Sequence, residues 1–337
     1  MKAVGYQKSL PITDAKSLVD VELPKPMASG RDLLVKVQAV SVNPVDTKMR
    51  MRAEPPAGGW QVLGWDAVGV VEAAGPDAKL FKAGDSVFYA GSINRQGTNA
   101  EFHLVDERIV GPKPKSLSIA EAAALPLTAI TAWETLFDRL DVKKPVPGAA
   151  NAVLIIGGAG GVGSIAIQLA RTLTDLTVIA TASRPETVAW AKQLGAHHVV
   201  DHAKPLAAEV ARLGLGAPAF VFSTTKTDRH FDQIVEVIAP QGRFGLIDDP
   251  DPIDVRKLKR KSASLHWEAM FTRSTFETAD ILEQHKLLTE VARLVDTGKI
   301  KTTLGETFGT INAANLRRAH SLIESGKAKG KIVLAGF

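Results

Sequence analysis

The chain has 337 residues, a hydrophobic content of 45%, a charged content of 23% and a formal net charge of +5. These values are ordinary for a water-soluble globular protein and allow two domains. No apolar stretch reaches the roughly 18 residues of a membrane-spanning helix, and no secretory signal is present, so we expect a cytoplasmic protein without a membrane span. The absence of cysteine excludes disulfides and cysteine-ligated metal sites. The basic run at residues 256–261 lacks aromatic residues, which favours solvated surface over a nucleic-acid site.

Residues 1–125 are rich in β-branched residues, with glycine and proline between the apolar runs. This pattern predicts strands at residues 33–42, 68–73, 86–89 and 101–105. No helical pattern alternates with these strands. The sequence therefore predicts a separate, mostly antiparallel domain.

A helical segment follows the β-rich part. Ser118 and Glu121 have the spacing of a capping box, which predicts a helix running toward Leu125. Pro126 interrupts this helix, and residues 127–140 resume helical spacing.

Residues 151–182 have the pattern of a strand, a glycine turn, a helix and a second strand. Gly158, Gly160 and Gly163 fit G-x-G-x-x-G between the first strand and the helix. In that setting the glycines permit a tight turn, admit a pyrophosphate and let helix pack on strand. N–H groups at the start of the helix would face the phosphates. We therefore expect a dinucleotide site here, although an ordinary glycine-rich turn is the alternative. The expected contacts of the turn are Gly158, Ala159, Gly160, Gly161, Val162 and Gly163.

The second strand is followed by Ser183 and Arg184, at the point where NAD-binding proteins carry an acidic residue. A hydroxyl and a guanidinium would accept a 2′-phosphate that a carboxylate would repel. The sequence thus favours NADP(H). The alternative is a polar helix start, with Pro185 at the first helical position.

Helices and strands then alternate, which predicts a parallel sheet with helices on both faces. The predicted helices are residues 187–194, 206–213 and 232–238, and the strands are 198–201, 219–223 and 242–247. The C-terminal part changes again, with predicted strands at 264–270 and 330–334 and helices at 277–297 and 313–325. We expect an α/β fold in which residues 126–262 are a dinucleotide-binding domain inserted between residues 1–125 and 263–337 of a β-rich domain.

Four ordered motifs resemble those of the medium-chain dehydrogenase/reductase superfamily, at residues 42–46, 64–71, 123–128 and 157–163. Within it, the chain is most similar to the quinone oxidoreductase branch and its zinc-type alcohol dehydrogenase-like subgroup. The resemblance implies a GroES-like β-rich catalytic domain and an inserted Rossmann domain. It also implies a homodimer or homotetramer.

The residues that bind zinc in the zinc-dependent members of this superfamily are replaced in this sequence. Zinc-dependent members place Cys where this chain has Asn43, and His-Glu where it has Trp65 and Asp66. Zinc prefers thiolate or imidazole ligands, so we expect no metal. The cluster of His197, His198 and His202 is interpreted as a polar strand edge near the adenosine.

By resemblance, Asn43 and Asp46 face the nicotinamide at the former zinc position, and Thr128 lies near the nicotinamide ring. Asp46 could equally be a structural turn residue, and Thr128 a helix hydroxyl bonded to backbone. Tyr89 could donate a proton or simply pack in the core. These four residues are the candidate catalytic groups.

Other residues complete the expected site. We expect His198, Ile247 and Phe271 among the cofactor contacts. An apolar slot for an aromatic acceptor could be formed by Trp65, Trp267 and Phe271, for which core packing is the alternative. Near the C-terminus, Lys327, Lys329 and Lys331 could reach the 2′-phosphate or remain in a surface loop.

Without zinc, the oxidation of simple alcohols loses its Lewis acid. The sequence therefore predicts an NADPH-dependent reductase that passes hydride to a quinone or another conjugated, electron-poor acceptor. An alkenal or enone double-bond reductase and an alcohol dehydrogenase-like enzyme are the alternatives. An alternative of another class is an NADPH-binding protein with little catalysis.

Overall fold

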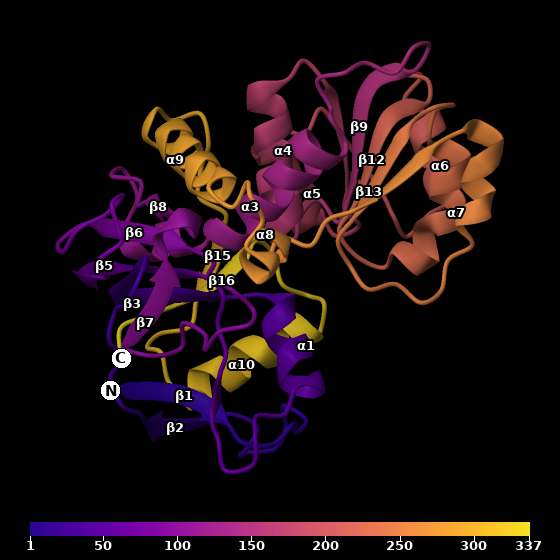
Figure 1. The fold of residues 1–337 in the computed structure, drawn as a ribbon. Coiled ribbons are helices and arrows are strands. Elements are labelled where there is room, and N and C mark those ends of the chain that lie inside the picture. The colour runs from indigo at the N-terminus through magenta and orange to yellow at the C-terminus, as the bar shows by residue number, and fades with distance from the viewer. The chain divides into compact units, whose positions relative to one another are not determined.

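The structure is a computed structural model that describes residues 1–337, which form two compact units. Unit 1 comprises residues 1–127 and 271–337, and unit 2 comprises residues 128–270 (Figure 1). Unit 2 is thus inserted into unit 1, as the sequence predicts. Its end lies after Met270 and not after residue 262, because β14 (Ser264–Trp267) pairs in parallel with β13 (Arg243–Leu246).

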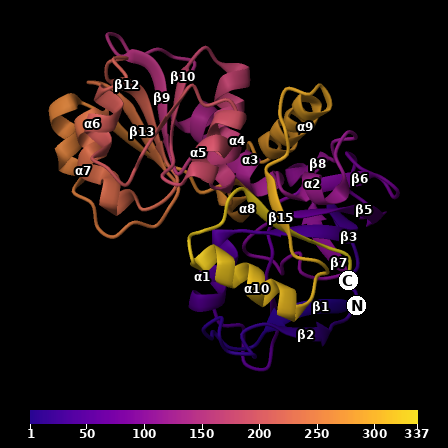
Figure 2. The ribbon, with the colours of Figure 1, turned by 180° about the vertical axis from the view of Figure 1, so that it is seen from behind.

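Unit 2 is built on a six-stranded sheet with the order β11-β10-β9-β12-β13-β14, and all its pairings are parallel. The remaining strands are β9 (Ala150–Ile156), β10 (Thr177–Thr181), β11 (His198–Val200) and β12 (Pro218–Ser223). The helices that cover the sheet are α4 (Gly161–Leu173), α5 (Pro185–Gln193), α6 (Leu206–Ala211) and α7 (Thr227–Val237). Figures 1 and 2 show α4 and α5 on one face and α6 and α7 on the other, which confirms the doubly wound arrangement.

The strands of unit 2 are apolar because helices cover both faces of the sheet. Leu154, Ile179, Val221 and Phe244 are fully buried in the resulting core. Gly195 ends α5 as the sequence predicts, with a φ of 105° that a side chain would strain.

Unit 1 contains a seven-stranded sheet and a small three-stranded sheet. The larger has the order β15-β16-β3-β5-β6-β8, with β7 also pairing with β3, and every pairing except β15 with β16 is antiparallel. Its strands are β3 (Asp32–Val42), β5 (Ala67–Ala74), β6 (Ser86–Tyr89), β7 (Phe102–Asp106), β8 (Val110–Pro112), β15 (Leu304–Thr307) and β16 (Lys331–Ala335). The smaller has the order β2-β1-β4, formed by β1 (Lys2–Tyr6), β2 (Val19–Glu22) and β4 (Gln61–Val62).

The helices of unit 1 include one that the sequence analysis does not assign, α1 (Pro44–Arg52). It carries no regular apolar stripe, but Pro44 suits the first helical position. The others are α2 (Ile119–Ala123), α8 (Thr272–Phe276), α9 (Glu283–Asp296) and α10 (Ala313–Glu324). The predicted capping box of α2 is confirmed. The Glu121 backbone N–H donates to Ser118 Oγ at 3.2 Å, and the Ser118 backbone N–H donates to Glu121 Oε2 at 2.9 Å.

The helix α3 (Pro126–Trp133) continues into a π-helical turn at Glu134–Arg139. Pro126 begins this helix and does not interrupt one, because proline is tolerated where no backbone donor is needed.

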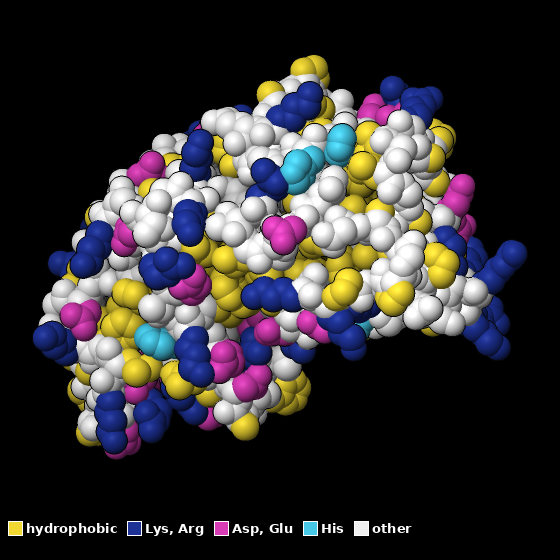
Figure 3. Space-filling view, turned by 90° about the horizontal axis from the view of Figure 1, so that it is seen from above, with side chains coloured by type: hydrophobic (Ala, Val, Ile, Leu, Met, Phe, Trp, Pro, Cys, Tyr) yellow, Lys and Arg dark blue, Asp and Glu magenta, His cyan; other side chains and the backbone are white.

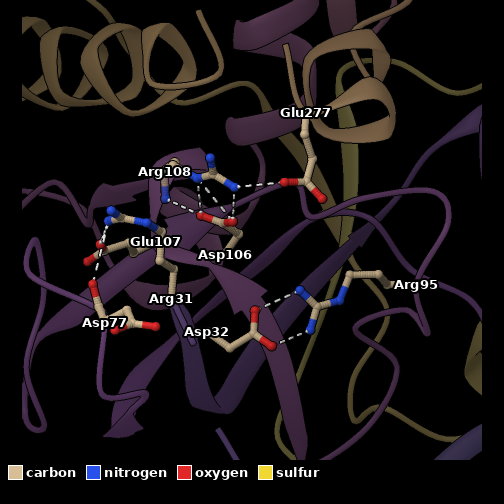
Figure 4. A network of polar contacts seen from close by, with 8 residues as sticks. All are labelled: Arg31, Asp32, Asp77, Arg95, Asp106, Glu107, Arg108 and Glu277. Atoms are coloured by element: carbon tan, nitrogen blue, oxygen red, sulfur yellow. Dashed lines mark hydrogen bonds and ion pairs between the residues drawn. The ribbon is translucent and has the colours of Figure 1, made fainter. Parts of the chain in front are cut away.

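A polar network ties the start of the C-terminal part to the sheet of unit 1 (Figure 4). The Arg95 guanidinium donates two bonds of 2.8 Å to Asp32 on β3. Arg108 pairs with Asp106 at the end of β7 and reaches Glu277, which follows α8, at 3.3 Å. Segments far apart in the chain are therefore joined by side-chain ion pairs as well as by strand pairing.

The surface carries both signs of charge. Figure 3 shows acidic side chains among the basic ones over the face that it draws. In the basic run, Arg256 pairs with Asp254 and Lys257 with Asp232. Across residues 1–337, no helix combines the length and the apolar character needed to cross a bilayer.

Candidate functional site

The glycine turn of unit 2 connects β9 to α4. Gly157 has a φ of 82°, and the backbone N–H groups of Gly157 and Gly158 donate to Thr181 Oγ1 and Thr181 O, at 3.0 and 3.1 Å. These bonds fix the turn against the end of β10.

The space around each glycine of the turn, measured by the contacts that an added Cβ atom would make, shows whether a dinucleotide fits. At Gly163 it would lie 2.2 Å from Gly157 O, so only glycine allows α4 to approach the turn this closely. At Gly160 it would meet only Gly157 O at 3.4 Å, so the surface there is open to a ligand. Backbone N–H groups in the first turn of α4, from Gly161 onward, have no intrahelical carbonyl to bond. The turn therefore fits a pyrophosphate.

The strand ends beside this turn carry several of the expected cofactor residues. Ser183 is exposed just after β10, and Ile247 is half-buried directly after β13. Arg184 caps α5, and its Nε lies 3.2 Å from Glu186 Oε1. The position of His198 differs: it lies opposite Ile179, two residues before the carboxyl end of β11, and is not brought to the turn.

Phe271 belongs to unit 1, where its ring contacts the Trp65 ring edge-on at a centroid distance of 6.1 Å. The Trp65 indole is buried and donates to Ser92 O at 3.1 Å. Trp267 lies on β14 of unit 2 and is 54% exposed. Trp65 and Phe271 therefore belong to unit 1, and Trp267 belongs to unit 2.

A buried polar cluster in unit 1 contains Asn43 and Asp46, two of the candidate catalytic groups. The Asn43 backbone N–H donates to Asp46 Oδ2 at 2.6 Å, so Asp46 caps the first turn of α1. The other carboxylate oxygen of Asp46 is buried without a hydrogen-bond partner. Burial raises the pKa of Asp46 to about 7, against the opposing effects of the Asn43 N–H and Lys331. Asp46 is a structural cap that can also hold a proton near neutral pH.

Asp66 and Lys331 form the charged centre of the same cluster. The Lys331 ammonium lies 3.2 Å from Asp66 Oδ2, donates to Val42 O at 3.0 Å and bonds Asn43 Oδ1. Asp66 also accepts three neutral hydrogen bonds, from Ser41 Oγ at 2.7 Å, Asn43 Nδ2 at 2.8 Å and the Leu127 backbone N–H at 2.8 Å.

The ionisation of this pair is set by opposing effects. Burial raises the pKa of Asp66 and lowers the pKa of Lys331, while their mutual attraction opposes both shifts. The four donors around the carboxylate favour the charged pair. Lys331 is thus a core residue, and the alternative in which it reaches the 2′-phosphate is wrong.

The donors at the former zinc position do not fit a metal. The Asn43 oxygen faces the Lys331 ammonium, Asp66 is saturated, and Trp65 offers only an N–H donor that is already used. A cation placed there would meet a positive charge. Residues 1–337 contain no group of three or more His, Cys, Asp or Glu side chains arranged to hold a metal ion.

Tyr89 and Thr128 are both buried. His103 Nε2 lies 2.9 Å from Gln96 O and must donate to it, so Nδ1 accepts the proton of the Tyr89 hydroxyl at 3.1 Å. Burial raises the pKa of Tyr89 and lowers the pKa of His103 to about 4. The geometry favours the packing role for Tyr89, because its proton is directed at a neutral imidazole. Thr128 lies in α3, the helix context of its structural alternative.

Sequence reasoning did not identify Thr181 as part of the glycine turn, and it did not place Lys331 in the buried polar cluster. Thr181 carries a usable signal, since it is the last residue of the strand that follows the glycine helix. Lys331 carries none, because a lysine at a strand start is ordinarily exposed.

Two family profiles and several known proteins match this chain. The sequence profile of the alcohol dehydrogenase GroES-like domain matches residues 29–115, and that of the zinc-binding dehydrogenases matches residues 194–334. A zinc-type alcohol dehydrogenase-like protein of Staphylococcus aureus is 40% identical over 336 residues, which cover 99% of both chains.

Solved structures give the same result. A Rhizobium etli protein named after the zinc-dependent alcohol dehydrogenases is 67% identical, with a TM-score of 0.99 over 100% of this chain and 98% of that one. A mycobacterial protein in complex with NADPH is 26% identical, with a TM-score of 0.83 over 99% of this chain and 100% of that one. Quinone oxidoreductases at 24% and 22% identity share the fold. The chain therefore belongs to the medium-chain dehydrogenase/reductase superfamily, as an oxidoreductase with a GroES-like domain and an inserted Rossmann domain.

Proposed function

We propose that this chain is a zinc-independent, NADPH-dependent oxidoreductase that transfers hydride to a quinone or another conjugated, electron-poor acceptor. The observation that carries the proposal is the Lys331 ammonium, which bonds Asn43 and Asp66 where zinc-dependent relatives carry metal ligands. The glycine turn supports dinucleotide binding, while the ammonium occupies the position of the metal that would act as the Lewis acid in alcohol oxidation. Conjugated acceptors spread incoming charge over their own π system and need no such metal.

The residues of the chain would supply binding, orientation and proton storage. Bound nicotinamide would supply the hydride. The open surface at Gly160 and the free N–H groups after it would hold the pyrophosphate. Asn43 is held rigidly by Lys331, and this preorganisation supports its proposed place beside the nicotinamide. Asp46, with a pKa of about 7, would hold a proton near neutral pH.

The assignment of NADPH rests on Ser183 and Arg184 just after β10, where NAD-binding proteins carry an acidic residue. The side chain of Arg184 is 41% exposed and that of Glu186, with which it pairs, is 55% exposed, so a phosphate can compete for the guanidinium. The NADPH complex of the mycobacterial relative supports this choice.

We also propose a cytoplasmic homodimer or homotetramer. β14 is the last strand of its sheet and its outer edge is unpaired, which leaves backbone groups available to a second copy. Light scattering on a size-exclusion column would give the mass, and a monomer at micromolar concentration would contradict this assembly.

The acceptor can be tested by following NADPH oxidation with ortho- and para-quinones, alkenals, enones and short aldehydes, and NADP reduction with short alcohols. We expect turnover with quinones and negligible alcohol oxidation. Rapid alcohol oxidation with inert quinones would overturn the proposal. Turnover of alkenals alone would support the double-bond reductase instead, and NADPH binding without any turnover would support a cofactor-binding protein.

An alcohol dehydrogenase is the second candidate because a 67% identical relative is named after the zinc-dependent enzymes. Elemental analysis of protein purified without added zinc distinguishes the two candidates. We expect far less than one equivalent of zinc and no loss of activity with a chelator. Stoichiometric zinc would refute the metal-free site.

A further inference from the structure

Three basic side chains meet at the carboxyl edge of the unit 2 sheet, outside the glycine turn. His202 follows β11, while Lys226 precedes α7 and His230 lies in its first turn. The two imidazole rings are edge-on, with a centroid distance of 6.1 Å and an interplanar angle of 63°. Both histidines are half-buried, and Lys226 is exposed.

His202 is linked to the glycine turn through one threonine. Thr181 Oγ1 accepts the backbone N–H of Gly157 at 3.0 Å and lies 3.1 Å from His202 Nδ1. The hydroxyl also carries a proton that it can donate to Nδ1. The His202 Nε2 then carries the ring proton and has no protein partner.

The other two side chains are also unpaired. Neither the imidazole of His230 nor the ammonium of Lys226 has a hydrogen-bond or ion-pair partner within residues 1–337. Lys226 is held in the left-handed region with a φ of 52°, a conformation that costs a residue with a side chain about 1–2 kcal/mol. Such strain often accompanies ligand sites. Three donors are therefore free at the edge of the sheet where dinucleotides bind.

We propose that His202, His230 and Lys226 form a proton-linked contact for the 2′-phosphate of NADPH, so that binding of this cofactor takes up protons. The inference rests on the proposed use of NADPH. Lys226 supplies a permanent charge, and the two imidazoles become donors to the phosphate oxygens when they are protonated. NADH lacks the phosphate and would leave both imidazoles uncharged.

The surroundings keep both histidines uncharged before binding. Burial is the main cause of the lowered pKa of His202, assisted by Lys226 and opposed by Asp201. For His230, burial again lowers the pKa, together with His202, Lys226 and Arg229, while Asp228 opposes them. A phosphate dianion beside the cluster would reverse this balance. Because the bound form would then have the higher pKa, NADPH binding should strengthen as pH falls.

The experiment is isothermal titration of NADPH and NADH at pH 7.0 in two buffers of different ionisation enthalpy, which gives the number of protons taken up. The variants are the double substitution His202→Asn with His230→Asn, and His266→Asn as a control on β14. The phosphate itself titrates near pH 6 in every variant. The difference between wild type and the double variant therefore isolates the imidazoles.

We expect wild type and His266→Asn to take up more protons with NADPH than the double variant does, and all three to bind NADH alike. If binding raises the pKa of one imidazole by about one unit, wild type gains up to roughly tenfold in NADPH affinity, relative to the double variant, between pH 8 and pH 5.5. Lys226→Met should weaken NADPH at every pH without affecting NADH.

Equal proton uptake and equal NADPH affinity in wild type and the double variant would overturn this inference while leaving NADPH as the cofactor. Equal affinity of wild type for NADPH and NADH at every pH would instead overturn the cofactor assignment, and this inference with it. Unchanged NADH affinity of each variant shows that it is folded.

Discussion

Replacing Lys331 with methionine should destabilise unit 1 far more than the loss of an ordinary ion pair. The side chains of Lys331 and Asp66 are only 3% and 0% exposed, so water cannot replace the missing ammonium. Asp66 would keep three neutral donors but lose its only cation. Removal of one partner from a buried pair typically costs about 3–5 kcal/mol, and we expect Lys331→Met to fall in this range.

Urea denaturation followed by circular dichroism would measure the loss. Lys25→Met is the matched control, because Lys25 pairs with Glu72 at the surface, where both side chains are about 40% exposed. An exposed pair contributes about 0–1 kcal/mol. The double variant Asp66→Asn with Lys331→Met should recover much of the loss, since no buried charge remains. A loss below about 1 kcal/mol, or no recovery in the double variant, would refute the charged pair.

The pH dependence of the stability of Lys331→Met is a second test of the charge on Asp66. Burial raises the pKa of Asp66, and removal of Lys331 removes the main opposing effect. A carboxyl group whose pKa is higher in the folded state makes the protein less stable as pH rises above the unfolded value. The deficit of Lys331→Met relative to wild type should therefore be smaller at pH 5 than at pH 8. A deficit that grows toward low pH would contradict this sign.

Four further variants test the remaining features. Gly163→Ala should destabilise unit 2 by about 1–3 kcal/mol, because its Cβ would meet backbone at 2.2 Å. Gly160→Ala should fold normally but lose dinucleotide binding. Urea denaturation measures the first effect and titration calorimetry the second. Arg184→Ala should weaken NADPH roughly tenfold, about 1.4 kcal/mol, and leave NADH nearly unchanged, so equal losses in calorimetry would contradict its role. Because the pKa of Asp46 is raised to about 7, wild type should lose stability as pH rises from about 4 to about 7, and Asp46→Asn should not show this loss. Parallel curves of stability against pH for the two proteins would argue against this.

The fold was largely predictable because its signals are local. The glycine turn, the capping box at Ser118 and the glycine after α5 each depend on residues a few positions apart. The alternation of apolar strands and amphipathic helices likewise fixed the sheet of unit 2. The strand at β14 was predicted, but it was assigned to the β-rich domain, because only its pairing with β13 shows that it belongs to unit 2. Helix α1 was missed for a similar reason, since its polar composition hides it.

The sites were less predictable because their contacts join distant parts of the chain. Lys331 and Asn43 are 288 positions apart, and nothing in the local sequence indicates that this lysine is buried. His202 was recognised only as a polar residue near the adenosine. Its ring contact with His230 arises because α6 and α7 cover the same face of the sheet. Side-chain clusters of this kind depend on topology, which a periodic pattern does not contain.

Two independent facts, one from the sequence and one from the structure, support the proposal that this site holds no metal. The missing cysteine removes the usual zinc ligand, but a nitrogen- or oxygen-ligated metal would still be chemically conceivable. The buried ammonium of Lys331 argues against that possibility too, because it contacts the oxygen of Asn43 that a metal would need. Two unit charges 4 Å apart repel by about 4 kcal/mol near a protein surface, and a divalent ion doubles this. A metal at this position would have to displace Lys331 from the core, so binding of zinc and an intact buried pair are mutually exclusive.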